Sequence, residues 1–225
     1  MELAIDTSTD IASLALVQDN EVLAELTWHC RQNHTVELLP NLAHLLNQAK
    51  LSPQSLSGII VAKGPGSFNG LRVGISIGKG LVFSLGIPIV GISTLEVEAY
   101  RQAKTGLPIC SISNAGREEI AAAIFQMKQN QWRQLVTEHI TTVKALCSQI
   151  TTKTIFCGEF IPSIASQLRK QLKQKAIILP SAGSGRATLL AKLGQQRLKA
   201  GNYDNPTTLQ PLYLRRPHIT KPKQR

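Results

Sequence analysis

Hydrophobic and polar residues follow two different periods along the first 100 residues. Ala12, Leu14 and Leu16 alternate with the residues between them, and a period of two is typical of a β-strand. Leucines then recur at steps of three and four from Leu38 to Leu46, which is the period of an amphipathic helix. The pattern predicts the order βββαβαβα, with three strands within residues 1–30, helices over 35–50, 71–85 and 94–103, and strands over 58–62 and 87–92.

The second half repeats this order less distinctly. The predicted strands cover 109–113, 119–127, 132–139, 154–157 and 176–179, and the predicted helices cover 143–150, 163–174 and 187–200. Two halves of equal order indicate a duplicated α/β fold with two lobes, over residues 1–103 and 104–210. Residues 211–225 hold three prolines and five Lys/Arg, which predicts an extended basic tail.

The composition narrows the class of protein. Hydrophobic residues make up 43% of the 225 residues and charged residues 17%, so the chain can bury a core. No apolar run reaches the roughly 18 residues of a membrane helix, and the first ten residues lack the basic start of a secretory signal. We therefore expect a cytoplasmic protein with no membrane partner. The four cysteines form no CxxC pair and are expected to be buried thiols in a reducing compartment.

Charge is distributed unevenly along the chain. Residues 1–160 carry 12 Lys/Arg and 13 Asp/Glu, a net of −1, whereas residues 161–225 carry 13 Lys/Arg and one acid, a net of +12. This asymmetry favours a polyanion near the C-terminal part. A solubilising surface with a loose basic tail explains it equally well, because base-reading aromatic residues are lacking.

A short polar segment follows the first strand. Asp6, Thr7 and Ser8 place a carboxylate and two hydroxyls at a turn between strands, where they can position a metal-bound phosphate. The alternative is an Asx-type turn that satisfies its own backbone.

A glycine-rich loop separates a predicted strand from a predicted helix. Gly64, Gly66 and Ser67 lie in the string GPGSFNG, residues 64–70, and backbone N–H groups in such a loop can approach a phosphate at a helix N-terminus. The loop lacks the Gly-Lys-Ser/Thr of a Walker motif. A tight structural crossover is the alternative.

Three glycines share one face of the helix that follows. Gly70, Gly74 and Gly78 lie four residues apart and therefore stack on one side. Glycine inside a helix costs roughly 0.5–1 kcal/mol relative to alanine, so we expect another backbone to approach this face. That neighbour is either part of the same chain or a helix of a partner.

The familiar hydrolase and metal motifs are missing from the sequence. It contains no GxSxG, no HExxH and no histidine pair four residues apart. His34 has Leu38 one turn later, so we interpret it as a capping or packing residue rather than a metal ligand. No metal site is predicted.

Four strings together resemble one protein family. They are LAIDTS (residues 3–8), NHT (33–35) before the leucine-rich helix, GPGSFNGLRVG (64–74) and PLYLRR (211–216). These strings are similar to TsaB, also called YeaZ, the dimerisation subunit of the bacterial tRNA threonylcarbamoyladenosine complex. The resemblance covers residues 1–100 convincingly, and from 101 to 200 it rests on length and element order.

The resemblance implies an actin-like fold and a scaffold role. The paralogous partner, TsaD, carries the metal on a histidine pair, whose matching positions here are His34 and Leu38. The broken pair implies a subunit without its own active site or cofactor, with ATP/ADP and a metal in the partner subunits or at their junction. Further implied partners are the TsaE ATPase, tRNA through the complex and, for the isolated chain, a second copy.

The family dimerises through N-lobe helices, and this implies specific contact residues. The residues expected to bind the partner are Leu38, Leu42, Leu45, Gly70, Leu71, Gly74, Ile75 and Gly78. The residues expected to contact tRNA are Arg215, Arg216, Lys221 and Lys223. A different hypothesis is a stand-alone actin-like ATPase or kinase that uses Asp6 and the 64–70 loop. It requires a second phosphate loop, for which residues 183–185 (GSG) are the only candidate.

Overall fold

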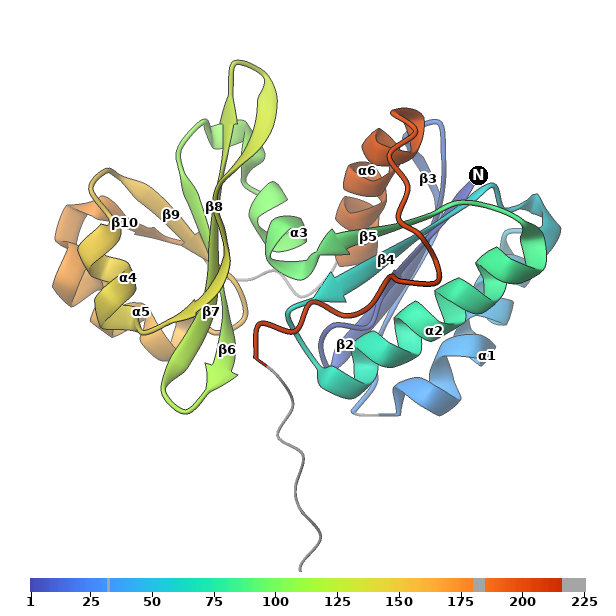
Figure 1. Cartoon of the computed structure of the whole chain (residues 1–225), viewed down its shortest axis with the longest axis horizontal. Helices are drawn as coiled ribbons and strands as arrows, with labels where there is room; N and C mark the ends of the chain where they lie inside the picture. Colours follow the sequence, from blue (N-terminus) through green and yellow to red (C-terminus); the bar gives the residue numbers. More distant parts are fainter. Residues whose placement is uncertain (32, 180–184, 216–225) are drawn as a thin grey trace, which may run out of the picture.

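The computed structural model describes residues 1–31, 33–179 and 185–215. Its main helices and strands follow the order βββαβαβα twice, which confirms the duplicated α/β order predicted from the sequence. Figure 1 shows the two halves as two lobes, each built on its own sheet. Short 3₁₀ turns at Pro53–Ser55, Ala103–Thr105 and Lys173–Lys175 lie between the main elements.

The N-terminal lobe contains a mixed sheet in the order β3-β2-β1-β4-β5. Its central strand pairs antiparallel with β2 and parallel with β4. Helices α1 and α2 cover one face (Figure 1) and pack leucines against the apolar side chains of the sheet. The bounds are β1 Glu2–Asp6, β2 Ile11–Gln18, β3 Glu21–His29, α1 His34–Gln48, β4 Gly58–Gly64, α2 Phe68–Leu85 and β5 Ile89–Ser93.

The C-terminal lobe repeats this arrangement with the strand order β10-β9-β6-β7-β8. Helices α4 and α5 cover its outer face (Figure 1) and build a second core around the buried side chain of Phe156. The bounds are β6 Ile109–Gly116, β7 Glu119–Lys128, β8 Gln131–Thr141, α4 Val143–Gln149, β9 Thr154–Cys157, α5 Ile161–Leu172 and β10 Ala176–Ile178.

The last helix of each half crosses to the other lobe. Helix α3 (Thr94–Tyr100) packs on the C-terminal sheet, and helix α6 (Arg186–Lys199) packs on the N-terminal sheet. A Cβ atom at Gly194 of α6 would lie 2.3 Å from Ile60 of β4, so glycine is required for this close approach. Residues 186–199, which the sequence assigned to the second lobe, therefore cover the first one.

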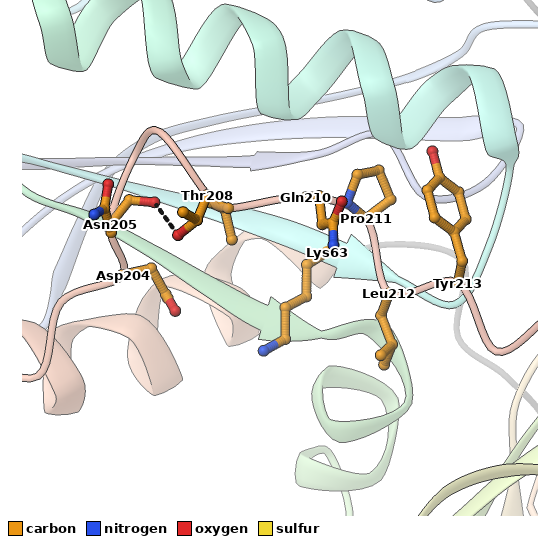
Figure 2. Close-up of a pocket in the computed structure, with 9 residues that line it drawn as sticks. Lys63, Asp204, Asn205, Thr208, Gln210, Pro211, Leu212 and Tyr213 are labelled. Carbon is orange, nitrogen blue, oxygen red and sulfur yellow. Dashed lines mark hydrogen bonds between the residues drawn. The ribbon is translucent and has the colours of Figure 1, made fainter.

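The segment after α6, residues 203–215, runs back along the N-terminal lobe and is called the strap here. Asp204 accepts a hydrogen bond from the backbone N–H of Gly91 (2.8 Å), and the N–H of Leu212 donates to the carbonyl of Lys63 (2.6 Å). Figure 2 shows the hollow of about 380 Å³ between the strap and the side chain of Lys63. Residues 211–215 are thus bonded to the protein. The sequence had instead assigned them to an extended basic tail.

Two further predictions concern buried groups and membranes. All four cysteines are buried free thiols, which agrees with the interpretation from the sequence. No helix in the described part of the chain is long and apolar enough to span a membrane.

Candidate functional site

The turn after β1 is buried and already bonded. One carboxylate oxygen of Asp6, Oδ1, accepts hydrogen bonds from the N–H (2.9 Å) and the hydroxyl (2.5 Å) of Ser8. The other oxygen, Oδ2, accepts from Nε of Arg186 at 3.0 Å. The bonds from Ser8 form the Asx-type turn that the sequence left open as an alternative. Both oxygens of Asp6 are therefore engaged within the chain.

Arg186, the first residue of α6, carries the charge that balances this turn. Its guanidinium also donates to Glu98 (3.1 Å) and to the hydroxyl of Ser8 (3.0 Å), and it lies 3.8 Å from Glu159. The side chain is only 5% exposed. Burial opposes the charge of Arg186, but Asp6, Glu98 and Glu159 outweigh it and raise the pKa of the guanidinium. A protein cation thus bonds to the carboxylate for which a metal-bound phosphate was one of two alternatives.

The glycine loop packs against the same turn. The N–H of Ser67 donates to the carbonyl of Ser8 (2.7 Å), and a Cβ atom at Gly66 would lie 2.2 Å from that carbonyl oxygen. Gly64 has a φ of 102°, which only glycine adopts readily. The hydroxyl of Ser67 then caps α2 by accepting from the N–H of Gly70 (3.3 Å). The loop serves as a tight crossover from β4 to α2.

A cleft of about 380 Å³ lies between the lobes beside this loop. Its lining includes two carboxylates, Asp10 and Glu159, and no Lys or Arg from the described residues. Burial raises the pKa of Glu159, and Arg186 opposes that effect only in part. The described lining therefore offers no side-chain cation that would bind a phosphate directly.

The glycine face of α2 points into its own lobe. Cβ atoms at Gly70 and Gly74 would lie 2.1 Å from the carbonyl oxygen and 2.2 Å from the hydroxyl of Thr7, and one at Gly78 would lie 2.8 Å from Val61. The hydroxyl of Thr7 donates to the carbonyl of Gly70 (2.8 Å). The close neighbours are therefore Thr7 after β1 and strand β4 of the same lobe, so the assignment of this face to a partner helix is wrong.

The apolar residues of this chain that were predicted to contact the partner are also buried. The side chains concerned are 4% exposed or less, because they pack against the sheet of their own lobe. They are Leu38, Leu42, Leu45, Leu71 and Ile75. The prediction was wrong for these residues, since a helix stripe that fills the core cannot also contact a partner.

The opposite sides of the same two helices carry exposed apolar residues. Val36 and Leu39 of α1 are 69% and 53% exposed, and Phe83 of α2 is 64% exposed. Ala43, one turn beyond Leu39, is exposed as well. Helices α1 and α2 pack side by side on one face of the sheet (Figure 1). We call the solvent-facing side of this pair the outer helix face.

His34 is a packing residue in this fold. Its side chain is 2% exposed, and its Nε2 lies 3.0 Å from the carbonyl oxygen of Thr9. Leu38, one turn later, fills the core. Among the described residues, no group of three or more His, Cys, Asp or Glu side chains is arranged to hold a metal ion.

One of the four residues predicted to contact tRNA lies in the strap and is bonded to this protein instead. Arg215 forms an ion pair with Glu119 of β7. Two residues earlier, Tyr213 accepts a hydrogen bond from Nε of Arg72 (2.8 Å) and contacts the ring of Phe68. The other three predicted contacts, Arg216, Lys221 and Lys223, lie outside the described residues, as do residues 183 and 184 of the second candidate phosphate loop.

Two lobes with exchanged helices and a cleft between them make up the actin-like ATPase fold. The sequence model of the family described as "TsaD: tRNA N6-adenosine threonylcarbamoyltransferase" matches residues 22–221. The structure of YeaZ from Pseudomonas aeruginosa is similar with a TM-score of 0.79 at 22% identity, over 95% of this chain and 99% of that one.

Curated relatives identify the family to which the chain belongs. The tRNA threonylcarbamoyladenosine biosynthesis protein TsaB of Bacillus subtilis is 32% identical over 217 residues, which cover 95% of this chain and 93% of the relative. A tRNA N6-adenosine threonylcarbamoyltransferase of Fervidobacterium nodosum is 35% identical over 113 residues, 44% of this chain and 34% of the relative. The chain belongs to the TsaB family.

Proposed function

We propose that the chain is a non-catalytic scaffold subunit of tRNA threonylcarbamoyladenosine biosynthesis, and that it binds the paralogue TsaD through the outer helix face. Relatives that cover 95% of the chain carry the name of this biosynthesis. The observation that carries the proposal is the exposed apolar surface on α1 and α2.

The outer helix face has the character of an interface. Val36, Leu39 and Phe83 are each more than half exposed, although fully burying a side chain of this kind contributes roughly 1.5–3 kcal/mol. Large apolar side chains that remain exposed on one pair of helices favour a protein–protein contact. The leucine stripe on the inner side of α1 already fills the core, so this surplus has no structural role within the lobe.

The interlobe cleft supports the non-catalytic part of the proposal. A stand-alone ATPase or kinase needs the carboxylate of Asp6 for a metal-bound phosphate, whereas Arg186 and Ser8 occupy both of its oxygens. Freeing Asp6 would remove one of the buried acidic partners of the Arg186 guanidinium, which is unfavourable. The cleft lining also supplies no Lys or Arg of the described residues to a phosphate.

A co-purification experiment tests the interface. The double variant Val36→Glu/Leu39→Glu places two charges on the outer helix face, and capture of the tagged chain should no longer retain TsaD. The matched control is Leu135→Glu/Tyr203→Glu, two residues of similar exposure (48% and 53%) away from α1 and α2. Equal retention of TsaD by both variants, each with its melting temperature preserved, would overturn the interface.

An activity assay tests the non-catalytic role. The purified chain alone should form no threonylcarbamoyladenosine from threonylcarbamoyl-adenylate and tRNA, and addition of TsaD should restore product formation. Turnover by the chain without any partner would contradict the scaffold role and favour an active site of its own.

A further inference from the structure

Several basic residues without an ion pair lie on the outer helices α4 and α5 of the C-terminal lobe and on the segments next to them. Residues 143–175 contain six Lys/Arg and one acid, Glu159, and Glu159 lines the interlobe cleft beside Arg186. None of the six forms an ion pair within the described part of the chain. They are Lys144, Lys153, Arg169, Lys170, Lys173 and Lys175, all exposed.

Several basic residues nearer the C-terminus are already bonded to the protein. Arg186 is buried with Asp6 and Glu98, and Arg197 and Arg215 form ion pairs with Asp204 and Glu119. Lys199 donates to the side chain of Asn20. Among the described residues after 140, most of the positive charge without an ion pair therefore lies on and next to α4 and α5.

A groove of about 1010 Å³ opens on this surface. Three elements line it: the turn between β6 and β7 with Arg117, the start of α4 with Lys144, and one side of α5 with Lys170. Ser163, Gln167 and Gln171 of α5 add neutral hydrogen-bond donors. Two acids also line the groove: Glu119 is paired with Arg215, and Glu118 lies at the turn.

We infer that this groove binds the phosphodiester backbone of RNA, an interaction that rests on the proposed function of the chain. Cations from three separate elements, with hydroxyl and amide donors between them, are the groups that contact phosphates in nucleic-acid complexes. The groove is too large for a single phosphate. Among the described residues, Phe160 is the only aromatic one in the lining. We therefore expect the groove to position the RNA backbone and not to read bases.

The location of the groove leaves the outer helix face free. Helices α4 and α5 lie at one end of the molecule and α1 and α2 at the other (Figure 1). The chain can therefore hold RNA with its C-terminal lobe and TsaD with its N-terminal lobe at the same time. The two interfaces can also be disrupted independently.

The test compares two triple variants of the full-length chain. Arg117→Gln/Lys144→Gln/Lys170→Gln neutralises the groove, and Lys104→Gln/Lys128→Gln/Lys192→Gln removes the same charge from exposed lysines elsewhere. Binding of a labelled, unmodified tRNA transcript is measured against NaCl concentration, with and without TsaD. Each lost phosphate contact lowers the slope of log K against log salt by about 0.7–0.9, so the groove variant should lose about 2 to 3.

Three outcomes decide the inference. The groove variant should bind tRNA at least about tenfold more weakly at low salt, while the control variant keeps wild-type affinity and both retain TsaD. Equal affinity and slope for the two variants would show a solvated basic face and overturn the inference. Displacement of tRNA by low concentrations of inorganic phosphate would assign the groove to a small anion and would also overturn the inference. Failure of the wild-type chain to retain TsaD would instead refute the proposed function.

Discussion

Replacing Arg186 with Met tests the interpretation of the interlobe cleft. Methionine keeps an unbranched apolar stem and removes the charge, which leaves Asp6 and Glu98 buried without a cation. Breaking a buried ion pair in this way costs about 3–5 kcal/mol. The total stability of a domain is about 5–15 kcal/mol, so we expect a severely destabilised but foldable chain.

Denaturation of the purified chain measures this loss. A chain of this size loses about 2–4 °C of melting temperature per kcal/mol, so Arg186→Met should melt about 6–20 °C below the wild type. The triple variant Asp6→Asn/Glu98→Gln/Arg186→Met removes the uncompensated charges as well. It should recover a large part of the lost stability, because neutral groups cost less to bury than unpaired ions.

A small effect would refute this reasoning. A loss below about 1 kcal/mol, without recovery in the triple variant, is the behaviour of an exposed ion pair. It would mean that water reaches Asp6 and that the carboxylate is available to a ligand. The stand-alone ATPase hypothesis would then regain its main residue.

Three further predictions concern the α2 glycines, the cleft and the strap. Gly74→Ala brings a Cβ within 2.2 Å of the Thr7 hydroxyl and should lower the stability of the isolated chain by about 1–3 kcal/mol; an unchanged melting temperature would contradict the inward orientation. The pKa of Glu159 is raised by burial, although its side chain is 54% exposed, so its ionised form weakens the fold only slightly above that pKa and not below the unfolded value. Glu159→Gln should therefore be slightly more stable than the wild type at pH 7, and denaturation at stepwise lower pH should show the difference vanish. Tyr213→Phe removes the hydrogen bond from Arg72 and should cost about 1 kcal/mol in the same assay, whereas Tyr203→Phe, at an exposed residue, should cost nothing.

The order of elements could be predicted from the sequence because it depends on local periods. The leucine period predicted a helix over 35–50, and α1 spans His34–Gln48. The helix expected over 71–85 is Phe68–Leu85 in the structure, since the Ser67 hydroxyl caps it earlier than the glycines suggested. Local signals of this kind lie within a few residues of the element that they define.

The neighbours of an element could not be predicted in the same way. The spacing of Gly70, Gly74 and Gly78 shows that something approaches α2, but the approaching group is Thr7 or Val61, far away in the sequence. Arg186 bonds to Asp6 across 180 positions, and no local pattern connects them. The one available signal was an arginine at the start of a predicted helix, which is ordinarily exposed.

The contacts of Arg186 also give a physical reason why this chain suits a scaffold role. Asp6 and Ser8 belong to the N-terminal sheet, Glu98 to the exchanged helix α3, and Glu159 to the C-terminal lobe. Enzymes that close around a ligand need lobes that rotate about a hinge. Here a buried arginine bonds to acidic residues of both lobes without a ligand. Separating the lobes would leave these buried charged groups without their partners. Under the proposed function, this network restrains the groove on α4–α5 relative to the outer helix face, as a subunit that presents RNA to its partner requires.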